Sequence, residues 1–185
     1  MMKLPMLLAV SALLAVPMAA QAVTYQFNAS LKGTNEVPPN ASLGTGLASL
    51  AYDDMGTIAL GDDVFSFTLS ASGMTGAAGA GHIHLGVAGV VGPPIVPLSG
   101  NPSFIFITGP TFTLVGSLGP VPAPSVFLSA LMASGTYVNL HTAAFPGGEI
   151  RGQLLPVTVV PEPSTYALML AGIGMMGMLA RRRRG

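Results

Sequence analysis

Glycine and proline divide the middle of the chain into short segments, and the spacing of these interruptions constrains the fold more than any other feature. Between residues 23 and 160, runs of β-forming residues recur about every 8 to 12 residues, a spacing typical of a β-sandwich or barrel. Residues 23–31 alternate apolar and polar side chains, which predicts a strand with one buried face. Further strands are predicted at 47–52, 57–60, 64–70, 82–85, 95–98, 103–108, 111–115, 136–142 and 149–155.

The connections between these segments are too short for repeated helical crossovers, so the strands are expected to pair antiparallel. One short helix is predicted over residues 126–133, capped by Ser125 and ended by Gly135. The chain has no cysteine, so the domain has to be stable without disulfides. We therefore predict one all-β domain, an antiparallel sandwich over residues 23–155, which is long enough to bury an ordinary core.

The first 22 residues predict a cleavable signal peptide. Lys3 is their only charge, residues 7–16 are an apolar run, and Ala20 and Ala22 form a small-residue cleavage site. The run is too short to span a membrane, for which about 20 apolar residues are needed. We expect export through the Sec translocon and cleavage by signal peptidase; the alternative is an uncleaved N-terminal anchor.

The C-terminal end predicts a transmembrane helix. A linker at 156–165 leads into an apolar run at 166–180, and the arginine-rich tail completes a segment at 166–185. At about 1.5 Å per residue the run reaches about 22 Å, short of a hydrocarbon core of about 30 Å, so local thinning or snorkelling is required. Arginines stay on the cytoplasmic side, so the run is expected to hold the domain outside the inner membrane. The alternative is that the arginines form a patch that binds nucleic acid. They are Arg181, Arg182, Arg183 and Arg184.

The charge of the central segment excludes one class of partner. Residues 23–160 carry two basic and six acidic side chains, a net charge of −4, which is unsuited to binding nucleic-acid phosphates. The chain also has no nucleophile elbow, no glycine-rich phosphate loop and no cysteine nucleophile. These patterns predict a protein that is not an enzyme.

The three histidines are the residues most suited to chemistry. His82 and His84 are two apart on a predicted strand, so both project from one face. His141 lies on another predicted strand, opposite Val138 and Leu140. Three imidazoles suit copper or zinc, so a metal site is one interpretation. The other is that each histidine hydrogen-bonds to the backbone or to a carboxylate.

Three further charged residues stand near these motifs. Glu149 and Arg151 are two apart on a predicted strand and face the same side. One interpretation is a carboxylate that orients a histidine such as His141. The other is a partly exposed ion pair worth about 0 to 1 kcal/mol. Glu36 precedes two prolines, Pro38 and Pro39, and is expected in a loop or at a sheet edge.

Three motifs together resemble the chordin-type, or CHRD, domain. They are residues 33–39, the His82–His84 strand, and the long block at 137–154. The resemblance covers roughly residues 24–155 and implies an extracellular all-β domain with no established catalytic activity. Residues 86–124 are richer in glycine and proline than the family pattern.

The C-terminal segment resembles the PEP-CTERM sorting signal, through Pro161, Glu162 and Pro163, the apolar helix and the arginines. This resemblance implies a Gram-negative host, an inner-membrane-anchored intermediate, and processing by an exosortase that removes the tail. It also implies delivery to the cell surface or extracellular matrix, linked to extracellular polysaccharide or biofilm.

The histidine pattern is similar to that of copper–zinc superoxide dismutases, in which an antiparallel sandwich carries a His-x-His strand. The likeness implies a Greek-key sandwich of the superoxide-dismutase-like or immunoglobulin-like kind. The dismutase site needs a fourth copper histidine and separate zinc ligands, and this chain has only three histidines. We therefore predict a non-enzymatic exported surface protein; the alternative is a secreted copper- or zinc-binding protein that uses His82, His84 and His141.

Overall fold

The structure, a computed structural model, describes residues 22–56, 62–101, 103–107, 111–121, 124–157 and 163–183. The strand predicted at 57–60 lies outside these residues. Elsewhere each predicted strand is confirmed in type, with bounds shifted by a few residues. The elements are β1 (Thr24–Lys32), η1 (Gly33–Asn35), β2 (Thr45–Asp53), β3 (Val64–Ser72), β4 (Ala78–Leu85), β5 (Pro94–Pro97), β6 (Phe104–Ile107), β7 (Thr111–Leu118), α1 (Pro124–Met132), β8 (Thr136–Thr142), β9 (Ile150–Gln153), β10 (Leu155–Pro156) and α2 (Pro163–Arg182).

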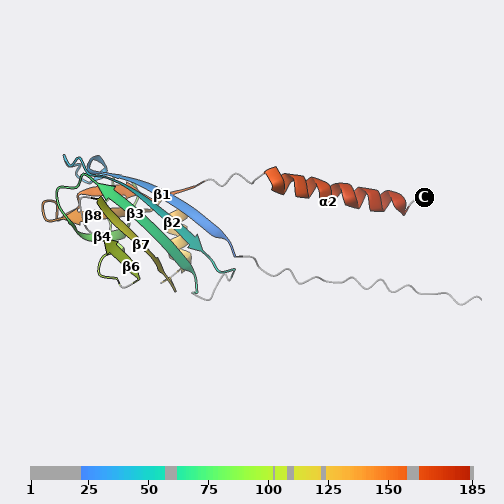
Figure 1. Cartoon of the computed structure of the whole chain (residues 1–185), viewed down its shortest axis with the longest axis horizontal. Helices are drawn as coiled ribbons and strands as arrows, with labels where there is room; N and C mark the ends of the chain where they lie inside the picture. Colours follow the sequence, from blue (N-terminus) through green and yellow to red (C-terminus); the bar gives the residue numbers. More distant parts are fainter. Residues whose placement is uncertain are drawn as a thin grey trace, which may run out of the picture.

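The ten strands form one antiparallel sheet that curves into a half-barrel (Figure 1). Its order is β5-β4-β8-β9-β1-β2-β3-β7-β6, with β10 also paired to β1. Strand β1 joins the two halves, because it pairs with β2 along one side and with β9 and β10 along the other. The all-β, antiparallel prediction is confirmed. The separate sheets of a sandwich are not found, because β1 makes the hydrogen-bonding continuous; the Greek-key order stays a prediction.

The core lies on the concave side of this sheet. Along β1, β2 and β3 every second side chain is buried, as the period of two along a strand requires. Strands β1 and β2 pair without interruption from Thr24↔Asp53 to Lys32↔Thr45, and β2 pairs equally regularly with β3. Such alternation fixes the register, since a slip of one residue exposes every buried side chain.

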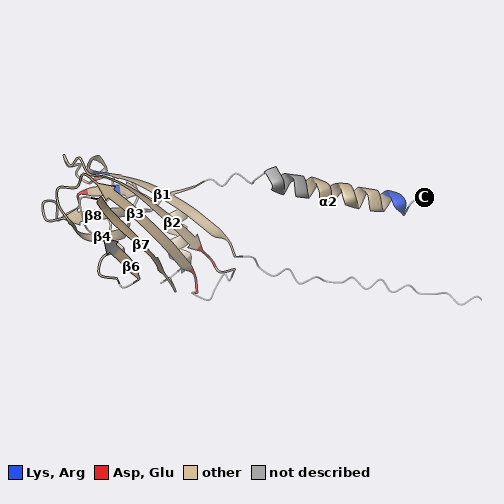
Figure 2. Cartoon of the chain, in the orientation of Figure 1, with Lys and Arg blue, Asp and Glu red and all other residues tan. Residues whose placement is uncertain are grey.

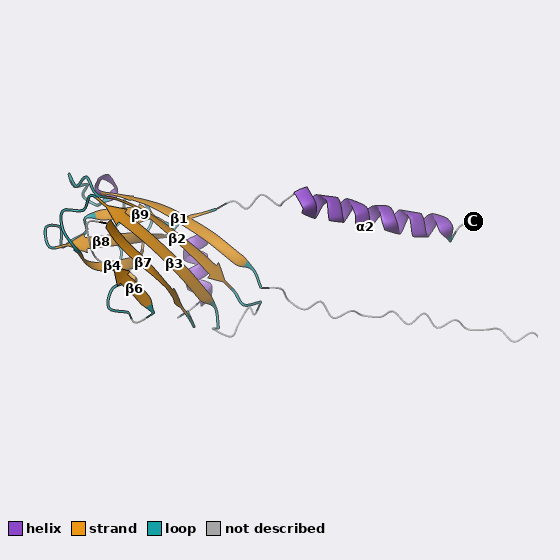
Figure 3. Ribbon diagram, in the orientation of Figure 1, coloured by secondary structure: helices purple, strands orange, loops and turns teal. Residues whose placement is uncertain are grey.

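Helix α1 covers part of the concave face, behind β2 and β3 in Figure 3. The ring of Phe127 lies 6.0 Å from that of Tyr52 and 5.6 Å from that of Phe65, measured between ring centroids. The predicted helix is confirmed, but it begins at Pro124, so Ser125 lies in the first turn and is not the cap. Proline suits a first turn because its missing N–H needs no partner there.

The two ends of the chain are described only in part. Ala20, Pro161, Glu162 and Arg184 lie outside the described residues, as do residues 1–21 of the predicted signal peptide. Helix α2 does form, and its described side chains from residue 169 onward are exposed. Within the part of the chain that the structure describes, no helix is long and apolar enough to cross a membrane. The predicted transmembrane helix is therefore not found; its apolar run of about 22 Å is short for a bilayer.

Charged residues are sparse along the sheet (Figure 2). The acidic residues lie near the ends of the strands, and a basic group ends α2 at Arg181 and Arg182. The strands themselves carry mostly apolar side chains on the concave face and small polar ones on the outer face. Buried charged or histidine side chains near β4, β8 and β9 are those of Glu36, His84, Glu149 and Arg151, while buried Asp63 lies before β3 and accepts a hydrogen bond from Tyr52.

Candidate metal centre

The pairing of β4 with β8 brings the three histidines together. His82 lies opposite Asn139 and His84 lies opposite Tyr137, so His141 is the diagonal neighbour of His82. Diagonal neighbours on one face of an antiparallel pair are within reach of long or aromatic side chains. One ring nitrogen from each histidine lies within 4.8 Å of the other two. The strands therefore assemble a cluster of three imidazoles from two distant parts of the sequence.

His84 is the most enclosed member of this cluster. Its Nδ1 lies 2.9 Å from the carbonyl oxygen of Gly92, and its ring stacks on Tyr137 at 4.8 Å and 15°. Burial lowers the pKa of His84; the Gly92 carbonyl opposes this, and the charges of His141 and Arg151 lower it further. Its Nε2 is buried and has no hydrogen-bond partner among the described residues. The neutral ring thus presents an unused nitrogen to the cluster.

His141 and His82 are only half-buried and lie against each other. His141 Nδ1 lies 3.0 Å from the carbonyl oxygen of Pro146, and its Nε2 lies 3.4 Å from His82 Nδ1. Burial lowers the pKa of His82, and the neighbouring His141 and His84 lower it further. In their neutral form, imidazoles whose ring nitrogens lie this close together can donate lone pairs to one metal ion.

Two residues that support the cluster were not singled out from the sequence. The Tyr137 hydroxyl accepts a hydrogen bond from the Gly92 N–H at 3.1 Å, and the Arg151 guanidinium carbon lies 3.4 Å above the Tyr137 ring. Tyr137 is two residues from Asn139 and four from His141, so its place on the histidine face follows from the strand period. Gly92 has no such signal: a Cβ there would overlap the Leu85 carbonyl oxygen, a contact that only the folded loop reveals.

Both interpretations of Glu149 and Arg151 are wrong. Glu149 is fully buried, and its carboxylate accepts hydrogen bonds from Ser42, Thr75 and Thr142 at 2.5 to 2.8 Å. Burial raises its pKa, but these hydrogen bonds outweigh burial and hold the pKa below its usual range. The Arg151 guanidinium donates to the carbonyl oxygens of Val87 and Val90, at 3.1 and 2.8 Å. Glu149 therefore neither orients His141 nor pairs at the surface.

Glu36 follows η1 in a loop, as predicted, but its side chain is 93 % buried. Asn139 donates to its Oε2 at 3.5 Å, while Glu36 Oε1 and Asn139 Oδ1 have no partner within the described segments. Burial raises the pKa of Glu36 to about 7, although Arg151 and the Asn139 hydrogen bond lower it. The residue lies at the edge of a pocket of about 510 Å³ that Arg151 and Gln153 also line.

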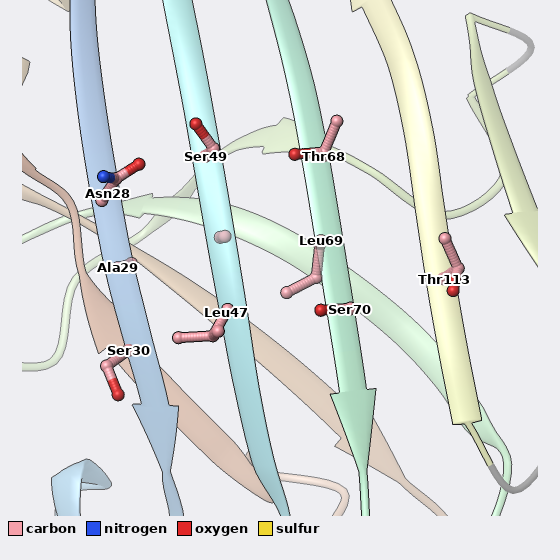
Figure 4. A pocket seen from close by; sticks show the side chains of 10 residues that line it. Asn28, Ala29, Ser30, Leu47, Ser49, Thr68, Leu69, Ser70 and Thr113 are labelled. Atoms are coloured by element: carbon pink, nitrogen blue, oxygen red, sulfur yellow. The ribbon is translucent and has the colours of Figure 1, made fainter.

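A second depression lies on the outer face of the sheet, across β1, β2, β3 and β7 (Figure 4). Its volume is about 460 Å³, and it is lined by small polar and apolar side chains. None of its lining residues is an acid, a base or a histidine. The lining residues are Asn28, Ala29, Ser30, Leu47, Ala48, Ser49, Thr68, Leu69, Ser70 and Thr113.

The half-barrel and its histidine-bearing end define a small β-domain joined by a linker to a separate C-terminal helix. Comparison with known families matches the CHRD domain to residues 27–154 and the PEP-CTERM protein-sorting motif to residues 159–184. The chain belongs to the CHRD-domain family. Its PEP-CTERM motif implies processing by an exosortase and points to an exported protein. No curated protein and no solved structure matches the chain.

Proposed function

We propose that the protein is a non-enzymatic surface module. An exosortase processes it, and the CHRD half-barrel is then presented on the outside of the cell. The observation that carries this proposal is the order of the two matched segments. The CHRD domain ends at residue 154 and the sorting motif begins at residue 159, so a single cut near the motif separates the complete domain from the tail.

The roles of the buried charged residues support a structural domain. Glu149 is saturated by hydrogen bonds from three side chains and one backbone N–H, and Arg151 is held by two loop carbonyls and the Tyr137 ring. These groups fix the loops at residues 42–44, 75 and 87–90 against the sheet. Buried polar groups with complete hydrogen bonding are typical of structural networks.

Sorting can be tested by following the mass and location of the exported protein. The full chain is expressed in a Gram-negative host with an exosortase, in the same host without it, and as a variant in which Pro161, Glu162 and Pro163 are replaced by alanine. We expect intact-mass spectrometry to show loss of the C-terminal tail only for the natural chain in the exosortase host. Protease treatment of whole cells should then reach the domain.

The matched control is Val157→Ala, which lies in the linker but outside the sorting motif and should be processed normally. The same mass and location for all strains and variants would overturn the proposal. Retention of the processed domain in the periplasm would overturn the surface part of it.

A further inference from the structure

We propose that His82, His84 and His141 form a binding site for one copper(II) or zinc(II) ion. The site does not depend on how the chain is sorted. His82 Nδ1 and His141 Nε2 are 3.4 Å apart. Two nitrogens bound to one tetrahedral ion at about 2.0 to 2.1 Å are separated by about 3.3 Å, so this pair already has the spacing of two ligands.

The third nitrogen needs only a small adjustment to join them. The three candidate ligand atoms lie within 4.8 Å of one another, so the widest pair has to close by at most about 1.5 Å to reach tetrahedral spacing. Rotation of an imidazole about its side-chain bonds supplies such a movement. The backbone need not move, because the β4–β8 register already places the three residues on neighbouring positions of one face.

Hydrogen bonds to the backbone prepare two of the rings as ligands. A carbonyl oxygen only accepts, so His84 Nδ1 donates to Gly92 and His141 Nδ1 donates to Pro146. In each neutral ring the proton on Nδ1 leaves the lone pair on Nε2. Such an outer hydrogen bond, which fixes the tautomer and the ring orientation, accompanies almost every metal-binding histidine.

His84 Nε2 gives the second independent observation. This atom is buried and unpartnered within the described part of the chain, on a residue that is 91 % buried. Leaving a buried polar atom without a partner costs about 1 to 3 kcal/mol. A metal ion bound by His82 and His141 would also be within reach of His84 Nε2, which would then have a partner as the third ligand atom.

His82 differs from the other two and provides a signature of binding. Without an ion, its Nδ1–H can donate to the Nε2 lone pair of His141, at the observed 3.4 Å. With an ion between them, both atoms have to present lone pairs, so the proton of His82 has to move to its own Nε2. Metal binding therefore predicts a tautomer change at His82 alone, while His84 and His141 keep their Nδ1 protons.

The ligand set also predicts an accessible fourth position. Three histidines leave a tetrahedral ion one further ligand, and open sites of this kind commonly hold water. His82 and His141 are half-buried, so solvent reaches the cluster from their side, while Tyr137 and His84 close the other.

The test uses the full chain, purified in detergent without an affinity tag and stripped of metal by a chelator. Zinc(II) and copper(II) are added separately, excess ion is removed, and bound metal is measured by elemental analysis and by competition with a coloured chelator. We expect one ion per chain. His82→Asn should weaken binding by more than about 100-fold, the upper end of the effect of losing an outer-shell partner. Thr113→Ala, on the outer face, should bind as the natural chain does.

His84 is buried, so His84→Ala is interpreted only if its circular dichroism matches that of the natural chain; His82→Asn, at a half-buried position, keeps the test decisive. Nitrogen-15 NMR of the imidazoles, with and without zinc, then follows the tautomers. A switch from Nδ1–H to Nε2–H at His82 alone supports the site. Absence of bound metal after loading with either ion, equal affinity of His82→Asn, or an unchanged His82 tautomer in the zinc form would each overturn it.

Discussion

The two halves of the sheet are stabilised in different ways. In β1, β2, β3 and β7 the buried positions are almost all apolar and alternate with small polar residues on the outer face. In β8 nearly every position is buried on both faces, and Tyr137, Asn139, His141 and Thr142 all belong to it. Loops cover this second half and supply hydrogen-bond partners to some of its polar side chains, such as Tyr137 and His141, whereas Asn139 Oδ1 has no partner within the described segments.

The two halves differ in how closely the positions of their buried side chains have to be fixed. Apolar burial is non-directional, at roughly 25 cal/mol per Å², so an apolar face tolerates many arrangements of similar volume. A buried polar group stabilises only when a partner lies at the right distance and angle, and otherwise it is costly. The first half therefore supplies stability, whereas the second half holds specific atoms in fixed positions.

The largest expected effect falls in the apolar half. Phe67 on β3 is fully buried, so Phe67→Ala should lower the free energy of unfolding by about 3 to 5 kcal/mol, because it removes buried area and leaves a cavity. Urea denaturation measures the loss. Thr68→Ala, on the exposed face of the same strand, is the control and should change stability by less than about 0.5 kcal/mol. Equal losses for the two variants would contradict the assignment of the core.

In the polar half, Glu149→Gln should destabilise by about 1 to 3 kcal/mol near neutral pH, since it removes the charge from strong hydrogen bonds. The folded pKa of Glu149 lies below its ordinary value of 4.5, so its stabilisation is present above that pH and disappears as the pH falls through the folded value. Urea unfolding at several pH values should show the difference from the natural chain shrinking in acid. A difference that is constant with pH would contradict this account.

Glu36→Gln should act in the opposite direction, with a smaller effect because Arg151 offsets part of the cost of ionising Glu36. The folded carboxyl has a pKa of about 7 against 4.5 when exposed, so between these values the folded state holds more protons than the unfolded state. The contribution of Glu36 to the free energy of unfolding should then fall as the pH rises from 4.5 to 7, measured as the difference between the natural chain and the glutamine variant. The glutamine variant should lose this slope and be the more stable protein at pH 8. A difference in stability between the natural chain and the glutamine variant that stays constant across this window would be evidence against the raised pKa.

The smallest effect is expected at Tyr137→Phe, which keeps the ring between Arg151 and His84 but removes the hydroxyl that holds Gly92. We expect a loss of about 1 kcal/mol, the net value of one neutral hydrogen bond. Thermal or urea unfolding of Tyr25→Phe, at a partly buried tyrosine that packs beside the core, serves as the comparison. A loss at Tyr137 no greater than that at Tyr25 would show that the stacking alone fixes the ring.

The strands of both halves could be predicted from the sequence because their signals are local. Period-two alternation at residues 23–31 and the His-x-His spacing each depend on neighbours along the chain. The continuity of the sheet could not be predicted. It depends on β1 pairing with β9 and β10, whose residues are more than 100 positions away in sequence. A sandwich and a half-barrel both bury one face of each strand, so they produce the same alternation of apolar and polar residues in the sequence.

The sequence by itself determined that the domain is antiparallel, that it contains no disulfide, and that His82 and His84 share a face. Only the tertiary structure decided that His141 lies beside them and that the Gly92 and Pro146 carbonyls orient two of the rings. It also decided that Glu149 accepts hydrogen bonds from the hydroxyls of two distant residues, Ser42 and Thr75, and does not reach a histidine. The physical reason is range: hydrophobic periodicity acts over a few residues, whereas a buried hydrogen bond requires two distant groups to meet at a fixed distance and angle.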